Sequence, residues 1–281
     1  MMCNMNHKFP IALVALLLFA LPALAADAPK LPADEKGAKA RLNASPRHGE
    51  MVDVAIPGAA TKIRSYVVYP ESKDKAPVVI VIQEIFGLSD WIRGVADQLA
   101  AEGFIAIAPD LLSGKGPRGG GTEAFADRDS VMQAVRGLKP DDVDKMLNAT
   151  RDYATKLPAA SSKYATIGFC WGGGTSFRYA TVTPELSAAV VYYGTSPATD
   201  TLEKIKAPVA GFYGGNDNRV NSTIADAQAK MKELKKPYTP HIMEGAGHGF
   251  LRQQDGQNGA NMKAAESAWP ETVKFLRENT K

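Results

Sequence analysis

Hydrophobic residues follow two periods that take turns along the chain. Residues 77–82 form an unbroken run rich in β-branched side chains, which is typical of a strand buried on both faces of a parallel sheet. Residues 89–102 place apolar side chains at i, i+3, i+4 and i+7, a spacing that predicts a helix with Ser89 or Asp90 as its cap. Residues 104–108 then predict the next strand.

The same alternation continues almost to the end of the chain. Later strands are predicted at residues 164–169, 188–193, 209–213 and 238–243, and helices at residues 123–135, 142–157, 172–181, 222–234 and 260–279. Before them, residues 51–56 and 63–69 predict a hairpin around the turn Pro57-Gly58. Strands that alternate with helices imply a mostly parallel sheet flanked by helices, with the antiparallel hairpin at one edge. We therefore expect an α/β fold with a single domain over residues 49–281.

The first 25 residues have the pattern of a secretory signal peptide. Lys8 provides the positive flank, residues 9–24 are apolar, and Ala23-Leu24-Ala25 is a small-x-small cleavage site. An uncleaved membrane anchor is the alternative, but 16 residues fall short of the roughly 20 that a spanning helix needs. We therefore expect cleavage after Ala25, a periplasmic or secreted protein, and no stable membrane insertion. Residues 26–48 lack sustained periodicity and predict a flexible lead-in.

The charge balance argues against a nucleic-acid partner. The chain has 33 basic and 30 acidic residues, and without residues 1–25 the balance is 32 to 30, with both signs interleaved along the chain. The same cleavage removes Cys3 and leaves Cys170 as the single cysteine. The mature chain then has no internal disulfide, even in the oxidising compartment that a signal peptide implies. A lone exported thiol points to a chemical role for Cys170.

The segment around Cys170 has the form of a nucleophile elbow. A predicted strand runs into Gly-x-Cys-x-Gly and then into a predicted helix, with cysteine where serine is usual. Such an elbow holds its nucleophile in a strained turn, and side chains at Gly168 or Gly172 would collide with neighbouring backbone. The helix N-terminus favours thiolate over thiol. The alternative is a small buried core cysteine.

A nucleophilic thiol needs an orienting acid and a base, which follow it along the chain of such a fold in that order. Asp217 follows the predicted strand at residues 209–213, and His248 lies in a glycine-rich loop after the last predicted strand. Asp217 could instead be a solvated or helix-capping residue. His48 and His241 are the other histidines after residue 25, and we expect both to be structural or surface residues. Asp217 and His248 are therefore the expected acid and base.

The loop after the strand at residues 77–82 supplies two more candidates. An oxyanion needs two backbone N–H donors, and we expect them at Trp171, directly after Cys170, and at Ile85 in this loop. Glu84 precedes Ile85, where a carboxylate faces either solvent or the site and could hold or deprotonate the thiol. The alternative is an acid at the rim that pairs with an arginine.

Together these motifs resemble the dienelactone hydrolase family of α/β-hydrolases over residues 50–279. The resemblance rests on Gln83-Glu84-Ile85-Phe86-Gly87, Ala108-Pro109-Asp110-Leu111, Gly168-Phe169-Cys170-Trp171-Gly172-Gly173, Asp217 and Gly247-His248-Gly249-Phe250. It implies a Cys-His-Asp triad of Cys170, His248 and Asp217, with Glu84 as the glutamate that helps to generate the thiolate when substrate binds. It also implies hydrolysis of an enol-lactone such as dienelactone without a cofactor.

The family also binds the substrate carboxylate with two arginines. Arg252, four residues after His248, matches one of them by position, and we expect Phe86 to contact substrate as well. The other should closely follow the Pro-Asp-Leu segment, where the chain has no arginine at the expected place; Lys115 and Arg118 are the nearest cations. Loss of a bidentate arginine weakens carboxylate recognition.

The sequence therefore predicts a carboxylesterase-type hydrolase, similar to carboxymethylenebutenolidase, that cleaves esters or lactones through an acyl-enzyme on Cys170. We expect a monomer that takes a small-molecule substrate and uses no cofactor or metal. Two alternatives remain. The chain could be a noncatalytic protein on the same fold, or a redox-active thiol protein that needs an external partner because it has no resolving cysteine.

Overall fold

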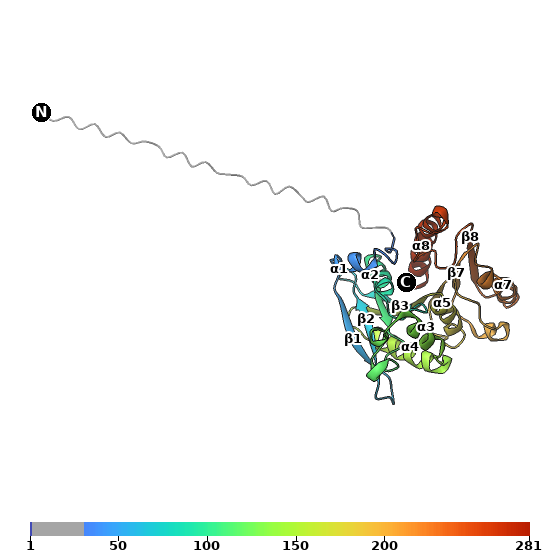
Figure 1. The fold of residues 1–281 in the computed structure, drawn as a ribbon, viewed down its shortest axis with the longest axis horizontal. Helices are drawn as coiled ribbons and strands as arrows, with labels where there is room; N and C mark the ends of the chain where they lie inside the picture. Colours follow the sequence, from blue (N-terminus) through green and yellow to red (C-terminus); the bar gives the residue numbers. More distant parts are fainter. Residues whose placement is uncertain (2–30) are drawn as a thin grey trace.

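Eight strands form one sheet in the computed structural model, which describes Met1 and residues 31–281 (Figure 1). The strands are β1 (Gly49–Ala55), β2 (Lys62–Val68), β3 (Ala76–Ile82), β4 (Ile105–Pro109), β5 (Ala160–Phe169), β6 (Ala188–Tyr192), β7 (Val209–Gly214) and β8 (Tyr238–Met243). Their order in the sheet is β1-β2-β4-β3-β5-β6-β7-β8. β2 is antiparallel to β1 and β4, and the other neighbours are parallel. The predicted α/β fold with an antiparallel N-terminal pair is confirmed.

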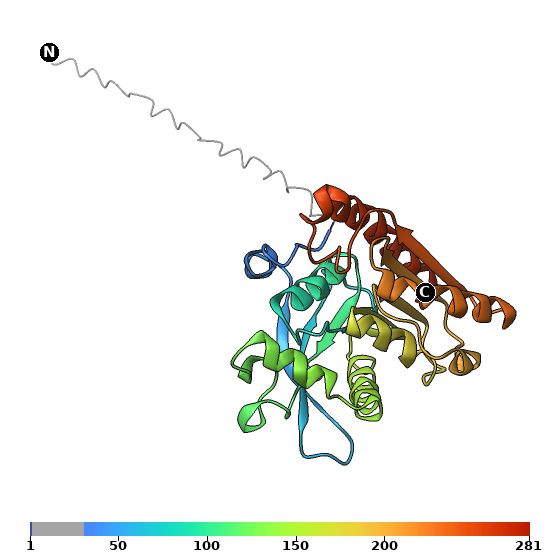
Figure 2. The ribbon, with the colours of Figure 1, turned by 45° about the vertical axis from the view of Figure 1, so that its right-hand side comes forward.

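Helices connect the strands and cover both faces of the sheet. They are α1 (Ala38–Asn43), α2 (Asp90–Ala101), α3 (Arg128–Arg136), α4 (Pro140–Ala154), α5 (Trp171–Tyr179), α6 (Asn218–Asn221), α7 (Ile224–Glu233) and α8 (Ala260–Asn279), with short 3-10 helices at Pro117–Gly119, Thr122–Ala124, Thr199–Lys204 and Gln257–Gly259. Side chains of α2 and α8 pack on one face, and side chains of α4, α5 and α7 pack on the other (Figures 1 and 2). The sheet is therefore the middle of three layers.

The position of strand β3 between two hydrophobic cores explains its apolar sequence. Val78, Ile80 and Ile82 belong to the core that includes α4, α5 and α7, whereas Val79 and Val81 belong to the core that includes α2 and α8. All five side chains are fully buried. A strand between two helical layers needs apolar residues in both registers, so the prediction of a strand buried on both faces is confirmed.

Two predicted helices begin later than the sequence pattern indicates. The helix expected from residue 123 begins at Arg128, because Asp127 accepts a hydrogen bond from the Ser130 N–H at 2.8 Å and caps the helix there. The helix expected from residue 222 begins at Ile224 and is preceded by the single turn α6. The other predicted boundaries agree with the structure within a few residues.

The lead-in departs most from its prediction. Residues 31–48 pack on the domain: the Trp91 indole N–H donates to the Ala33 carbonyl at 3.1 Å, and the Gln254 amide donates to the Pro32 carbonyl at 2.9 Å. The short helix α1 lies against α2. The expectation of flexibility is therefore wrong for these residues. Their partners lie far away in sequence and leave no local periodicity that could reveal them.

The predicted signal peptide at residues 1–25 and the start of the lead-in at residues 26–30 lie outside the described residues, apart from Met1. Within the described part of the chain, no helix is long and apolar enough to cross a membrane. All candidate site residues named above fall in the described part.

Candidate active site

Polar side chains meet at the carboxyl edge of the parallel strands. Glu84 follows β3, Cys170 follows β5, Tyr193 follows β6, Asp217 lies beyond β7, and His248 lies beyond β8. Because β3 and β5 to β8 are parallel neighbours, these positions share one edge of the sheet, the edge where open α/β sheets bind ligands. Four of these residues belong to the predicted set, and Tyr193 does not.

Cys170 stands in the strained turn that the sequence predicts. Its backbone has φ 54° and ψ −116° at the junction of β5 and α5, a conformation that residues with a Cβ rarely adopt. A Cβ at Gly168 would lie 1.9 Å from the Gly172 carbonyl oxygen, and one at Gly172 would lie 2.2 Å from the Gln83 carbonyl oxygen. The backbone therefore requires glycine at both positions, and the predicted elbow is confirmed.

The surroundings of the Cys170 sulfur favour the protonated thiol over the thiolate. Burial and the nearby Glu84 carboxylate raise the pKa of the thiol, and they outweigh the backbone N–H groups of Trp171 and Ile85 and the Arg219 guanidinium, which lower it. The helix N-terminus alone therefore does not produce a resting thiolate. Both N–H groups therefore act on the sulfur, and donors for an oxyanion formed beside it belong in such a position.

His248 and Asp217 form a close pair. The His248 Nδ1 atom lies 2.5 Å from Asp217 Oδ2, and the Asp217 side chain is 7% exposed. The other Asp217 oxygen caps α6, where it accepts a hydrogen bond from the Val220 N–H at 3.4 Å. The two predicted roles of this aspartate, pairing and capping, therefore coexist. The His248 ring also packs edge-on against Tyr193, with ring centroids 5.2 Å apart.

Glu84 is buried next to the thiol. Its side chain is 3% exposed, and its Oε2 atom lies 2.8 Å from Arg252 Nε. Burial raises the pKa of Glu84 to about 7, although the positive charge of Arg252 lowers it. The Tyr193 hydroxyl also acts on this carboxyl group and lowers its pKa. The alternative of a rim acid is therefore right about the arginine partner and wrong about the exposure.

A cavity of about 780 Å³ lies beside Cys170. Its lining combines site residues, an apolar wall and three cations: Ile85, Trp171, Tyr193, Leu138, Pro140, Val143, Arg136, Arg178 and Arg219. Arg178 is held by Asp144 through contacts of 2.5 and 2.8 Å, whereas Arg136 and Arg219 are exposed. Among the described residues that line the cavity, none is acidic. The cavity therefore suits neutral or anionic ligands.

The two predicted substrate-binding residues lie outside this lining. Arg252 is 8% exposed and pairs with both Glu84 and Glu35. The Phe86 ring is covered by Arg128, whose Cζ atom lies 3.6 Å from the ring centroid. In this structure Arg252 therefore forms ion pairs with two carboxylates of its own chain.

Three residues of the site are absent from the predicted set. Tyr193 is the last residue of the strand predicted at residues 188–193, and a hydroxyl at a strand end is a signal that could have identified it. Arg219 lies two residues after Asp217, so its place in the same loop was a usable signal as well. Arg136 has no such signal, because only the position of α3 in the fold brings it to the cavity.

Related sequences match most of this chain. The sequence matches the Dienelactone hydrolase family over residues 63–280. A Salmonella typhimurium protein named "Putative carboxymethylenebutenolidase" is 30% identical over 237 residues, which cover 80% of this chain and 86% of that protein. A protein of the same name from Saccharolobus solfataricus is 31% identical over 254 residues, which cover 78% of this chain and 95% of that protein.

Solved structures share the fold. A "Putative Dienelactone Hydrolase" from Klebsiella pneumoniae has a TM-score of 0.71 at 25% identity, covering 82% of this chain and 99% of that one. A dienelactone hydrolase-like promiscuous phosphotriesterase from metagenomic libraries has a TM-score of 0.70 at 24% identity, covering 84% and 99%. The family match spans the whole sheet edge that carries Glu84, Cys170 and His248, and the chain therefore belongs to the dienelactone hydrolase family, a family of hydrolases on the α/β-hydrolase fold.

Proposed function

We propose that the protein hydrolyses esters or lactones through a thioester on Cys170. The observation that carries the proposal is the meeting of these groups at one edge of the sheet. The backbone N–H groups of Trp171 and Ile85 act on the Cys170 sulfur and lower its pKa, and the His248–Asp217 pair lies at the same edge. A nucleophile, a proton carrier and oxyanion donors are the parts that acyl transfer requires.

The first half of the proposed reaction forms the thioester. As substrate enters, ionised Glu84 takes the thiol proton, and the Cys170 thiolate attacks the carbonyl carbon. The backbone N–H groups of Trp171 and Ile85 stabilise the tetrahedral oxyanion. Its collapse breaks the C–O bond and expels the alcohol oxygen as an anion. This step favours enol and phenol leaving groups, because their anions are stable without a proton.

The second half uses water. His248, oriented by Asp217 through its Nδ1 atom, removes a proton from water, and the hydroxide attacks the thioester carbon. Collapse of this second intermediate releases the carboxylic acid, and Cys170 regains its proton from Glu84. The imidazolium proton neutralises the anion of the leaving group, so the protons balance over the cycle.

The cavity lining supports a substrate with an anionic group. Arg136 and Arg219 are exposed, and the described lining contains no acidic residue. A guanidinium can bind a carboxylate through two parallel hydrogen bonds. We assign carboxylate binding to Arg219, whose charge already lowers the pKa of the Cys170 thiol, and not to the buried Arg252.

The test compares p-nitrophenyl acetate with cis-dienelactone as substrates for the protein without residues 1–25. Cys170→Ala should abolish both activities, and dienelactone should turn over faster than the acetate. Arg219→Gln should raise KM for dienelactone about tenfold, the effect of one lost charged hydrogen bond, and leave KM for the neutral acetate unchanged. Turnover that survives in Cys170→Ala refutes the proposed nucleophile. An equal effect of Arg219→Gln on both substrates refutes the assignment of the carboxylate.

We also propose export to the periplasm or the medium. Its support is the sequence pattern of residues 1–25. Cell fractionation and intact-mass measurement of the purified protein test it. A periplasmic or secreted chain that begins at Ala26 supports export, and an uncleaved chain in the cytoplasm refutes it.

A further inference from the structure

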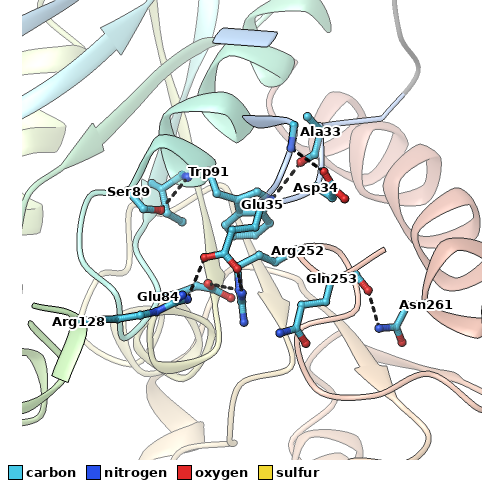
Figure 3. A network of polar contacts seen from close by, with 12 residues as sticks. Ala33, Asp34, Glu35, Glu84, Ser89, Trp91, Arg128, Arg252, Gln253 and Asn261 are labelled. Carbon is cyan, nitrogen blue, oxygen red and sulfur yellow. Dashed lines mark hydrogen bonds and ion pairs between the residues drawn. The ribbon is translucent and has the colours of Figure 1, made fainter. Parts of the chain in front are cut away.

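The N-terminal segment of residues 31–37 is fastened close to the site (Figure 3). The Trp91 indole holds the Ala33 carbonyl at 3.1 Å, and the Glu35 N–H donates to the Arg252 carbonyl at 2.9 Å. Both contacts use the backbone of the segment, so they place Glu35 whatever its side chain is. Its carboxylate is directed inward, toward the loop that carries Glu84 (Figure 3).

Glu35 belongs to a row of four alternating charges, Arg128, Glu35, Arg252 and Glu84 (Figure 3). Arg128 donates to Glu35 Oε1 at 2.9 Å, Arg252 Nη1 donates to Glu35 Oε2, and Arg252 Nε lies 2.8 Å from Glu84 Oε2. The row runs from the surface into the protein. The exposed fraction of the side chains falls from 51% at Arg128 and 40% at Glu35 to 8% at Arg252 and 3% at Glu84. A charge held near the surface is thus connected to the buried carboxylate beside Cys170.

The structure shows what Glu35 adds to this row. Without Glu35, the buried Arg252 would pair with Glu84 alone. Its positive charge would then favour the ionised carboxylate more strongly, and Glu84 would be a weaker base. Glu35 opposes this effect in two ways. It shares the Arg252 guanidinium, and its own negative charge raises the pKa of Glu84.

The other groups that face Glu84 do not supply this effect. Arg128 and the Tyr193 hydroxyl lower the pKa of Glu84. The Cys170 sulfur also acts on Glu84 from close by, but burial and Glu84 raise the pKa of the thiol and so favour its uncharged form. Among these groups, Glu35 supplies the negative charge that raises the pKa of Glu84.

We propose that Glu35 is a positioning residue for hydrolysis at Cys170. Held by the N-terminal segment, it shares the Arg252 guanidinium with Glu84 and so leaves Glu84 able to take the Cys170 proton. The inference rests on the proposed function. It gives the packed N-terminal segment a part in the chemistry, in addition to its contacts with the core.

The test records kcat and KM for ester hydrolysis against pH in the wild type and three variants. Glu35→Gln keeps an oxygen that accepts from Arg252 but loses the charge. The acidic limb of its kcat profile should move to lower pH by about one unit, and kcat on the plateau should fall severalfold because Glu84 becomes a weaker base. KM should stay within about twofold of the wild type, since Glu35 does not line the described cavity.

Two variants serve as controls. Glu35→Asp keeps the charge and should keep the acidic limb of the wild type. Asp34→Asn changes the neighbouring carboxylate, which accepts the Gly37 N–H at 2.8 Å in the same segment, and it should also leave the limb in place. A limb that does not move in Glu35→Gln, or that moves equally in Asp34→Asn, overturns the inference.

Failure of the proposed function would show differently, as activity that survives in Cys170→Ala. If no ester is hydrolysed at all, the rate of Cys170 alkylation by iodoacetamide against pH, followed by peptide mass, replaces the kinetic profile. Its inflection from Glu84, near pH 7, must then move to lower pH in Glu35→Gln. An inflection that stays in place overturns the inference.

Discussion

Replacing Glu84 with glutamine measures how ionisation of the buried carboxyl group changes the free energy of unfolding. The side chain is 3% exposed, and its pKa is raised from 4.5 to about 7, chiefly by burial. Glutamine has nearly the same shape and keeps polar atoms for Arg252, but it never ionises. The difference in unfolding free energy between Glu84→Gln and the wild type therefore isolates the ionisation of Glu84 in the folded protein.

The direction of the effect follows from proton binding. Between pH 4.5 and about 7, folded Glu84 keeps its proton while the unfolded chain has released it, so the wild-type free energy of unfolding falls as the pH rises. The contribution of Glu84 is fully present below pH 4.5 and is lost as the pH rises through about 7. A pKa difference of about 2.5, at about 1.4 kcal/mol per unit, corresponds to about 3–4 kcal/mol.

Urea-induced unfolding of both proteins at pH 5, 6, 7 and 8 measures this difference. Between pH 5 and pH 8 the unfolding free energy of Glu84→Gln should rise by about 2–3 kcal/mol relative to the wild type, most of it below pH 7. A difference in hydrogen bonding between the glutamine amide and the protonated carboxyl group would shift the variant by a similar amount at every pH. Glu71→Gln, at an exposed position between β2 and β3, is the matched control and should show no trend. A difference between Glu84→Gln and the wild type that stays constant over this range refutes the reasoning.

Three further predictions concern the same sheet edge. Asp217→Asn should lower kcat by about 10²- to 10⁴-fold with little change in KM, because the histidine loses the carboxylate that orients it; steady-state kinetics with a near-normal kcat would contradict this. Glu84→Gln should speed alkylation of Cys170 by iodoacetamide at pH 8, since loss of the Glu84 charge lowers the pKa of the thiol; peptide mapping that finds equal rates would exclude it. Gly172→Ala should cost about 1–3 kcal/mol or more in urea unfolding, because its Cβ would lie 2.2 Å from the Gln83 carbonyl oxygen; unchanged stability would show that the elbow relaxes.

Local patterns in the sequence were enough to predict the elements and the backbone of the elbow. The apolar run of β3 and the period of α8, which is observed over the predicted residues 260–279, record burial on a fixed side of a regular element. The turn at Cys170 is equally local, because the glycines it needs lie two residues to either side. The order of nucleophile, acid and histidine along the chain then predicts which strand ends carry them.

The tertiary structure decided the pKa values of Glu84 and Cys170 and which arginines pair with carboxylates of the chain. Glu35 and Arg252 pair across 217 positions of sequence, and the polar composition of the lead-in predicts flexibility instead of that contact. The pKa values of Glu84 and Cys170 depend on how much water burial removes, which no local pattern encodes. The sequence by itself therefore determined which reactive groups stand at the strand ends. Only the packing of distant segments decided that the pKa of the thiol is raised, that Arg252 pairs with carboxylates of its own chain, and that Arg219 lines the cavity.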